Sequence, residues 1–400
     1  MEWILREVLI GGQWSPAEGG TYEIVDPSTE EAIGAAPEAP PAQVQAACRA
    51  AREAFEFGPW PALSGAERGA CLLRAADRIE KRAPELIRLA MAETGSTRSH
   101  ADQVQVRVAA ERLRMYAALA GESNETVLPP LEREPIAGSS ARTAAVVTSR
   151  EPVGVVVCIC PANTPATNCA GKVGPALAMG NTVVMKPPVQ DPLGMAELAR
   201  ELDACLPPGV VNYVAGRAPE IGEALVASPD VDMISFTGST HVGRRIAEVA
   251  GRGMKRTLLE LGGKSASIVF ADCGGRRPPD CERGFFYEPT LLTSVDNRME
   301  VAQQEIFGPV IAAIPFDDGD EAVRIANDSE FGLYGYVWTA DAERAQRVAK
   351  GIRTGTVQIN GAPPNPWAPF GGFKHSGVGR DGGRYGLEAY SELKYLGWAT

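Results

Sequence analysis

The run VGVVVCIC (153–160) opens a series of short apolar segments that decides the fold of this chain. It is followed by NTVVMK (181–186), VVNYV (210–214), DMISF (232–236) and ASIVF (266–270). Helical stretches begin between these runs, near residues 166, 191, 219 and 239. Continuous Val/Ile runs separated by helices are typical of an α/β fold whose parallel sheet is covered on both faces. Because such sheets bind ligands beyond the carboxyl ends of their strands, we expect the chemistry there.

The flanking segments are mixed. Upstream, strand-like EVLIGGQW and TYEIVDP precede three stretches with helical spacing, at 41–57, 65–94 and 98–120. Ser64 and Glu67 predict a capping box at the start of the second stretch, and ARTAAVVTSR (141–150) alternates like an exposed or edge strand. Downstream, strand patterns occur in EPTLLTSV, GPVIAAIPF, YGYVWT and GTVQIN, with helices at 320–328 and 341–352.

Composition excludes several classes of protein. With 400 residues, 44% hydrophobic and 22% charged, the chain is long enough for two or three globular domains. A net charge of −11 disfavours nucleic acid as a partner. No apolar run reaches the length of a membrane span, and the first residues do not resemble a signal peptide. Eight cysteines without a CxxC motif favour the cytoplasm, and three scattered histidines predict no metal site.

Two strand ends carry residues suited to a phosphate or a ribose. In FTGST (236–240), Gly238 lets a backbone approach closely, and a helix beginning at Ser239 presents free N–H groups. An ordinary capped helix would look the same. Lys186 ends another strand, where it is either a solvated lysine or a contact to the ribose or phosphate.

Two further polar residues stand beside apolar strands. Glu260 lies in LELGG (259–263), where burial would raise its pKa and suit it to act as a general base. The alternative is a structural, ion-paired glutamate. Asn163 ends CPAN (160–163), where its amide could stabilise an oxyanion or could simply belong to a turn.

Taken together, these motifs resemble the NAD(P)-dependent aldehyde dehydrogenase superfamily over nearly the whole chain. The matching pieces occur in the family's order. They are Asp26-Pro27, AETG (92–95), P-x-N (161–163), GNTVVMKP (180–187), FTGST (236–240), LELGGK (259–264), QEIFGP (304–309) and PFGGFKHSGVGR (369–380).

The resemblance implies an architecture. Residues 1–121 and 151–270 would form the dinucleotide-binding domain, and residues 271–384 a shortened α/β catalytic domain. Residues 122–150 with 385–400 would form oligomerisation strands that pair across subunits, giving a homodimer or a homotetramer.

The resemblance also implies roles, with an aldehyde as the substrate and NAD or NADP as the cofactor. Asn163 resembles the oxyanion donor and Glu260 the base that activates water for deacylation. Ser239 would meet the pyrophosphate, Lys186 the adenosine ribose and Glu305 the nicotinamide ribose. The full set of expected cofactor contacts is Cys160, Pro161, Lys186, Gly216, Gly238, Ser239, Gly243, Leu261, Gly262, Glu305 and Phe307.

One departure concerns the adenosine ribose. The family often carries a glutamate where this chain has Val189. Without that carboxylate a 2′-phosphate is not repelled, so we expect NADP to be tolerated.

A second departure concerns the nucleophile. Family chemistry runs through a cysteine thiolate that attacks the aldehyde. Here SIVFADC (267–273) runs directly into GGRRPPDCERGFFYEPTLL (274–292), so roughly 80–100 residues that include the nucleophile loop are missing. Cys273 and Cys281 are weak substitutes or plain loop thiols. The chain is expected to be either a family enzyme with little turnover, a non-catalytic dinucleotide-binding scaffold, or the product of an internal deletion without independent function.

Overall fold

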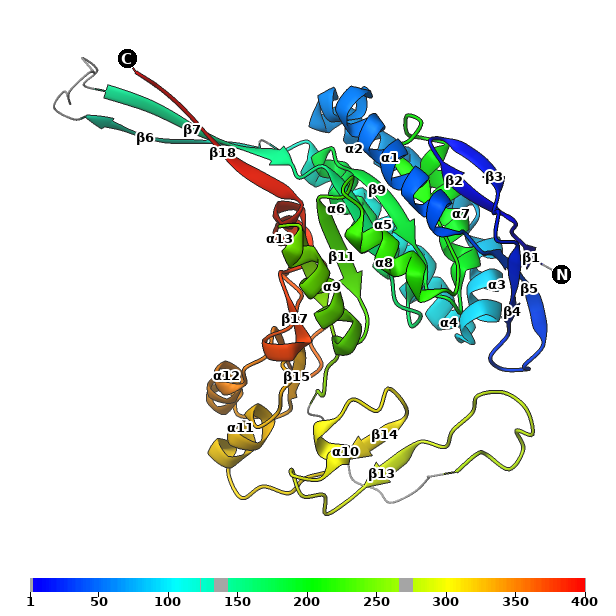
Figure 1. Ribbon diagram of the computed structural model, residues 1–400. Helices are drawn as coiled ribbons and strands as arrows, with labels where there is room; N and C mark the ends of the chain where they lie inside the picture. The colour runs from blue at the N-terminus through cyan, green and yellow to red at the C-terminus, as the bar shows by residue number, and fades with distance from the viewer. Residues whose placement is uncertain (1–2, 123, 133–142, 266–275, 400) are drawn as a thin grey trace.

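The computed structural model describes residues 3–122, 124–132, 143–265 and 276–399, and it is built around an eight-stranded sheet (Figure 1). The strand order is β17-β12-β11-β8-β9-β10-β2-β3. Five central strands are parallel: β12 (Arg256–Glu260), β11 (Met233–Thr237), β8 (Val155–Ile159), β9 (Thr182–Lys186) and β10 (Val211–Tyr213). The antiparallel strands are β17 (Gly377–Val378), β2 (Glu7–Ile10) and β3 (Gln13–Pro16).

This order contains a topological switch point. From β8 the chain proceeds outward through β9 and β10, then restarts on the other side of β8 with β11 and β12. Connections therefore diverge between β8 and β11, which is where open α/β sheets leave a crevice for ligands.

Helices cover both faces of the sheet, as the sequence predicts. One face carries α1 (Pro41–Phe57), α8 (Pro219–Ala227) and α9 (Thr240–Arg252). The other carries α2 (Gly65–Lys81), α5 (Arg107–Ala120), α6 (Pro165–Met179) and α7 (Pro192–Asp203). Strand β8 is apolar throughout because both of its faces are buried. Val155 and Val157 pack in the core under α1, α8 and α9, whereas Val156 and Cys158 pack in the core under α2, α5, α6 and α7.

Four of the five predicted strands match observed strands of the sheet. The sheet also contains β12, formed by RTLLE (256–260), which was not predicted from the sequence. Only Leu258 and Leu259 are apolar in it, so its pattern is weak. The expected strand at 266–270 falls outside the described residues.

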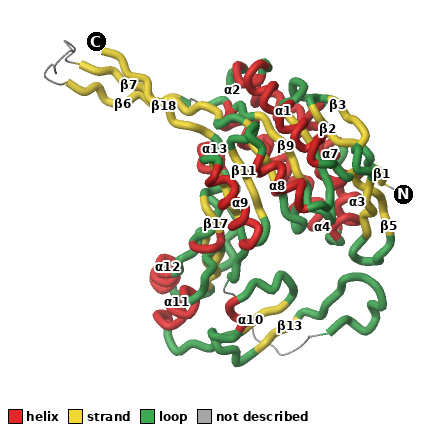
Figure 2. Tube along the Cα trace, in the orientation of Figure 1, coloured by secondary structure: helices red, strands yellow, loops and turns green. Residues whose placement is uncertain are grey.

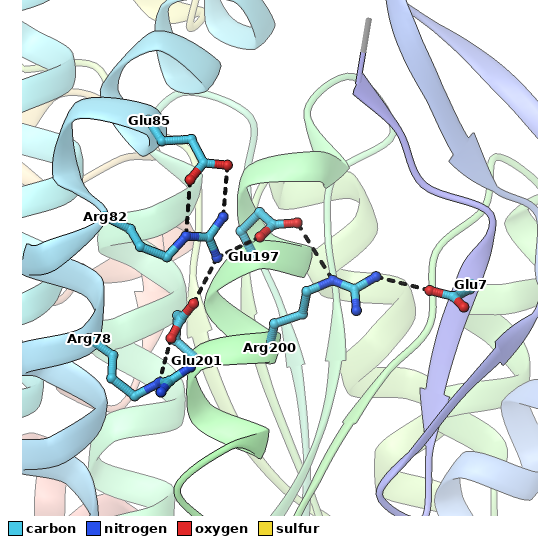
Figure 3. Close-up of polar contacts among 7 residues, drawn as sticks. All are labelled: Glu7, Arg78, Arg82, Glu85, Glu197, Arg200 and Glu201. Carbon is cyan, nitrogen blue, oxygen red and sulfur yellow. Dashed lines mark hydrogen bonds and ion pairs between the residues drawn. The ribbon is translucent and has the colours of Figure 1, made fainter.

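The helical stretch predicted at 65–94 is two helices, because α2 ends before Arg82 and α3 (Ala83–Thr94) follows. Pro84 lies in the first turn of α3, where a missing N–H costs nothing. Arg82 forms ion pairs with Glu85 at 2.9 Å and with Glu197 and Glu201 of α7 at 2.7 Å each (Figure 3). Ion pairs to α7 therefore hold the junction between α2 and α3 in place.

Two other local predictions can be compared directly. The capping box at the start of α2 is confirmed: the Glu67 N–H donates to Ser64 Oγ and the Ser64 N–H donates to the Glu67 carboxylate. The stretch 98–120 comprises α4 (Arg98–His100), a π-helical segment (Ala101–Val106) and α5. Near the N-terminus, β1 (Trp3–Ile4), β5 (Ala32–Pro37) and β4 (Thr21–Val25) form a small separate sheet.

A three-stranded arm extends away from the body (Figure 1). It consists of β6 (Glu125–Glu132), β7 (Thr143–Pro152) and β18 (Ser391–Ala399), all antiparallel, in the order β18-β7-β6. The segment predicted as an exposed or edge strand, 141–150, supplies the middle strand rather than an edge, because the C-terminal strand pairs along its second side. Helix α13 (Gly383–Ala389) leads into this strand.

Residues 276–382 contain a lobe with little regular structure, which Figure 2 shows as loop around short strands. Its strands form two separate parallel pairs, β13 (Thr290–Leu292) with β14 (Val310–Ala312) and β15 (Tyr334–Val337) with β16 (Thr356–Ile359). Its helices are α10 (Glu300–Gln303), α11 (Gly319–Asn327) and α12 (Ala342–Gly351). Within the described part of the lobe, no residue belongs to either hydrophobic core cluster. Across the described ranges of the chain, no helix has both the length and the apolar character to cross a membrane.

Candidate functional site

The carboxyl ends of β8, β11 and β12 meet at one edge of the sheet. In register, Ile159 lies opposite Phe236, and Thr237 lies opposite Glu260. The loop that carries Asn163, the turn at Gly238 and the end of β12 therefore share this edge, beside the switch point. We call it the carboxyl edge.

Glu260 is a buried carboxyl at the end of β12. It is 5% exposed, and neither carboxylate oxygen has a hydrogen-bond partner among the described residues. Burial raises the pKa of Glu260 to about 8, and the negative charge of Asp381 acts in the same direction, while Lys172 and Arg380 oppose it. A carboxyl with a pKa near neutrality can both accept and return a proton, which suits a general base. The alternative of an ion-paired structural glutamate is not supported, since Glu260 forms no ion pair with any residue that the structure describes.

Two charged neighbours of Glu260 were missed by the sequence analysis. Lys172 of α6 is 1% exposed, and its Nζ has no hydrogen-bond partner within the described residues. Asp381 is 9% exposed and accepts a hydrogen bond of 3.4 Å from the Tyr116 hydroxyl. A single lysine inside the apolar run of α6 was the signal that could have identified Lys172.

The turn after β11 is shaped to admit a phosphate. A Cβ on Gly238 would lie 2.5 Å from the Phe236 ring, so any side chain there would have to displace that ring. Ser239 Oγ accepts the Val242 N–H at 3.3 Å and caps α9. The N–H groups of Thr240 and His241 donate to no acceptor in the described chain, and free N–H groups at a helix start can hold an anion. Ser239 is thus a helix cap in a position that also fits a pyrophosphate.

Lys186 ends β9 next to the start of the Cys160 loop. Its carbonyl accepts the Cys160 N–H at 3.2 Å, and its Nζ donates to the Pro187 carbonyl at 3.0 Å. Burial lowers the pKa of Lys186. Gly216 follows β10 with a φ of +153°, and a Cβ there would lie 2.2 Å from Ile221. The half-buried Pro161 belongs to the same edge.

Gly262 and Gly263, which follow β12, lie against the carboxylate of Glu305 from the lobe. Glu305 Oε1 accepts the Gly263 N–H at 3.1 Å, and a Cβ on Gly262 would lie 2.6 Å from Glu305 Oε2. A Cβ on Gly243 would lie 2.4 Å from Leu261, so α9 packs directly against the strand end. The structure therefore brings Glu305 to the carboxyl edge.

Phe307 follows in the same loop. It has a φ of +52° and a side chain that is 75% exposed. Its exposure leaves an aromatic surface close to the Glu305 loop.

Asn163 is not joined to Glu260. It is exposed, and its Oδ1 accepts the Thr164 N–H at 2.9 Å, as a turn residue would. No hydrogen bond connects Asn163 to Glu260 among the described residues.

Two cysteines were named from the sequence as weak substitutes for the nucleophile, Cys273 and Cys281. Cys273 lies outside the described residues. Cys281 is half-buried in a loop whose hydrogen bonds to the rest of the chain go to residues 27–31, for example from the Phe285 N–H to the Pro27 carbonyl at 2.8 Å.

The other thiols close to the carboxyl edge are buried. Burial raises the pKa of Cys158, and a hydrogen bond to Cys160 together with burial raises the pKa of Cys169 well above its usual value. Both thiols therefore stay protonated near neutral pH. Among the described residues, no group of three or more His, Cys, Asp or Glu side chains could hold a metal ion.

Comparisons with known proteins identify the family of this chain. The sequence profile described as "Aldehyde dehydrogenase family" matches residues 14–274 and 272–396. The geranial dehydrogenase of Castellaniella defragrans is 35% identical over 481 positions, which cover 97% of this chain and 98% of the relative.

Solved structures match as well. An aldehyde dehydrogenase of Mycobacterium tuberculosis complexed with NAD+ has a TM-score of 0.92 and 32% identity, covering 99% of this chain and 98% of the other. A cysteine-to-alanine mutant of aldehyde dehydrogenase C of Pseudomonas syringae, complexed with NAD+ and octanal, has a TM-score of 0.90 and 33% identity, covering 98% and 96%. The chain therefore belongs to the aldehyde dehydrogenase family.

Proposed function

We propose that this chain binds NAD or NADP at the carboxyl edge and retains the base, but not the nucleophile, of an enzyme that oxidises an aldehyde to a carboxylic acid. The observation that carries the proposal is Glu260, a buried carboxyl without a partner at the end of β12. An unsatisfied buried carboxyl is costly, and groups of this kind cluster at functional sites.

The residues at the edge fit the cofactor. The free N–H groups behind Ser239 would hold the pyrophosphate, and Lys186 would reach the adenosine ribose. Glu305 would hold the nicotinamide ribose while Phe307 covers that end. When bound, the nicotinamide supplies a hydride acceptor. Val189 offers no carboxylate to repel a 2′-phosphate, so NADP is accepted alongside NAD.

Glu260 would be able to take a proton from a water molecule, as the base of the deacylation step does, although without a nucleophile no acyl group forms on this chain. Its pKa of about 8 matches this task near neutral pH. Lys172 lies close enough to lower that pKa by its charge, so it would stabilise the ionised base. Asn163 would serve as the oxyanion donor once its amide turns away from Thr164.

The nucleophile is what this chain lacks. The alignment with the geranial dehydrogenase spans 481 positions, whereas the chain has 400 residues, so at least 81 positions have no counterpart here. The family profile also matches in two pieces that meet at residues 272–274. These two facts support an internal deletion that removes the catalytic cysteine segment, which leaves Cys273 and Cys281 as weak substitutes.

Titration of the purified protein with NAD+ and with NADP+ tests the binding half of the proposal, and formation of reduced cofactor with a panel of aldehydes tests the other half. We expect both cofactors to bind and turnover to be at least ~1,000-fold below that of the geranial dehydrogenase, as for enzymes without their nucleophile. Turnover that iodoacetamide abolishes would contradict the proposal, and peptide mapping would identify the alkylated cysteine.

A second candidate function is a non-catalytic, dinucleotide-binding scaffold. It is favoured by the contrast between an intact sheet with two cores and a lobe that belongs to neither. In both cases we propose a cytoplasmic protein without nucleic-acid or membrane partners. We also propose a homodimer or homotetramer that assembles through the arm, whose apolar side chains are exposed, as in Tyr395 at 66% and Val127 at 77%.

A further inference from the structure

Helices α2 and α7 pack side by side and are joined by a row of ion pairs (Figure 3). Arg82 of α2 pairs with Glu197 and Glu201 of α7 at 2.7 Å each, and Arg78 pairs with Glu201 at 2.6 Å. Moving back along α2 therefore moves forward along α7. Because residues three or four positions apart lie on one face of a helix, the next contacts in this row involve positions 74 and 71 of α2 and position 205 after α7.

The row ends at two cysteines that a single arginine contacts. Arg74 Nη2 donates to Cys71 Sγ at 3.1 Å and to the Cys205 carbonyl at 3.4 Å. The Cys205 N–H donates to the Leu202 carbonyl at 2.9 Å, which keeps Cys205 against the last turn of α7. Cys71 Sγ thus lies within two hydrogen-bond lengths of the Cys205 backbone.

The two thiols differ in how easily a small solute can reach them. Cys71 is 8% exposed and belongs to the core under α2, whereas Cys205 is half-buried at the margin of that core. Burial raises the pKa of Cys205, the charges of Arg78 and Arg74 lower it, and a charge on Cys71 raises it. The thiols are therefore close enough for one to influence the ionisation of the other, and Cys205 is the one that solvent reaches.

We propose that Cys71 and Cys205 form a disulfide when the protein meets hydrogen peroxide, and that this bond fastens α2 to the end of α7. The Cys205 thiolate attacks one peroxide oxygen, the O–O bond breaks, and a sulfenic acid and one water form. Cys71 sulfur then attacks the sulfenic sulfur, the S–O bond breaks, and a second water leaves. In total two thiols give up two electrons and two protons, and hydrogen peroxide is reduced to two water molecules.

The bond closes a long stretch of chain, because α3, α5, α6, β8 and β9 all lie between the two cysteines. A cross-link of this kind mainly restricts the unfolded chain and so favours the folded one. The loop after α7 leads into the beginning of β10, at the end of the sheet opposite to the carboxyl edge. The disulfide is thus a modification site separate from the cofactor site, and it is reversible, as disulfides of redox-responsive proteins in reducing compartments are.

The test is peptide mapping of the full-length chain, which is first reduced and then treated with hydrogen peroxide. Remaining thiols are alkylated, and the chain is digested without reductant. We expect one linked peptide that contains Cys71 and Cys205 and that dithiothreitol separates. The Cys205→Ser variant should not form it. The Cys281→Ser variant, which removes another half-buried cysteine, is the matched control and should form it like the parent.

Urea unfolding of the same samples provides a second readout. Oxidation should raise the midpoint by at least ~0.5 M urea in the parent and in the Cys281→Ser variant, and should leave the Cys205→Ser variant unchanged. Peroxide treatment that leaves Cys71 and Cys205 unlinked, or that links them only between two chains, would overturn the proposal. An oxidised parent that unfolds at the same urea concentration as the reduced parent would overturn it as well. Neither readout depends on the cofactor or on turnover, which test the proposed function.

Discussion

Gly262 is the residue whose replacement separates cofactor binding from folding. A Cβ at this position would lie 2.6 Å from Glu305 Oε2, so Gly262→Ala displaces the carboxylate from the Gly263 N–H. We expect NAD+ affinity to fall about tenfold, the equivalent of ~1.4 kcal/mol, measured by calorimetry. Gly222→Ala is the matched control, because nothing lies within 4 Å of its Cβ, and it should bind NAD+ like the parent. If both variants bind NAD+ with the same affinity, Glu305 does not contribute to cofactor binding.

Glu260 makes stability depend on pH. Its pKa is about 8 in the folded chain and 4.5 in the reference state, so the folded protein holds the extra proton between these values. The contribution of Glu260 to stability is therefore most favourable below pH 4.5 and is lost as pH rises toward 8, by up to roughly 5 kcal/mol.

The Glu260→Gln variant has no carboxyl to ionise, so it should not lose this stability as pH rises. Urea unfolding across this pH window should show the variant gaining stability over the parent as pH rises. Glu53→Gln, an exposed substitution on α1, is the control and should track the parent. A parallel pH dependence of Glu260→Gln and the parent would show that the group is not buried as described.

For individual residues, the sequence was enough to identify those within motifs but not to predict their contacts. Glu260 was found because it lies between leucines and glycines, and that neighbourhood does bury it. Lys172 was not found, because its proximity to Glu260 depends on how α6 crosses the sheet. The turn conformation of Asn163 likewise depends on a local bond to Thr164 that no spacing predicts.

Among the elements, α2 offers a direct test of local sequence signals. Ser64→Ala removes the acceptor for the Glu67 N–H and half of the capping box. The free energy of unfolding should fall by about 1 kcal/mol in urea titrations. Ser64→Thr keeps the hydroxyl and should lose less than half as much. Equal losses would mean that the hydroxyl does not stabilise the helix.

The elements that sequence predicted poorly are those whose neighbours decide them. Strand β12 has only two apolar residues, and its place in the sheet comes from pairing with β11 and β17. The break at Arg82 depends on carboxylates of α7, more than 100 positions further along the chain. Strand β7 becomes a middle strand only because β18 returns to it.

For the whole molecule, the proposed assembly through the arm can be tested by mutation. Tyr395 is 66% exposed on β18, an edge strand of the arm. If oligomers form through this surface, Tyr395→Lys should shift the mass measured by light scattering toward the monomer. Phe57→Lys changes another exposed aromatic residue, 83% exposed on α1, and should leave the mass unchanged. A monomeric parent, or an unchanged mass of the Tyr395 variant, would contradict assembly through the arm.

The arrangement of β18 also bears on how the chain is made. It pairs with β7, whose residues precede the entire parallel sheet, so the ribosome releases one strand of the arm some 240 residues before its partner. Until then β7 remains open along one side. Long-range pairings of this kind are slow to form and leave nascent chains prone to mispairing. We therefore expect the position of one terminal strand to make the nascent chain dependent on chaperones.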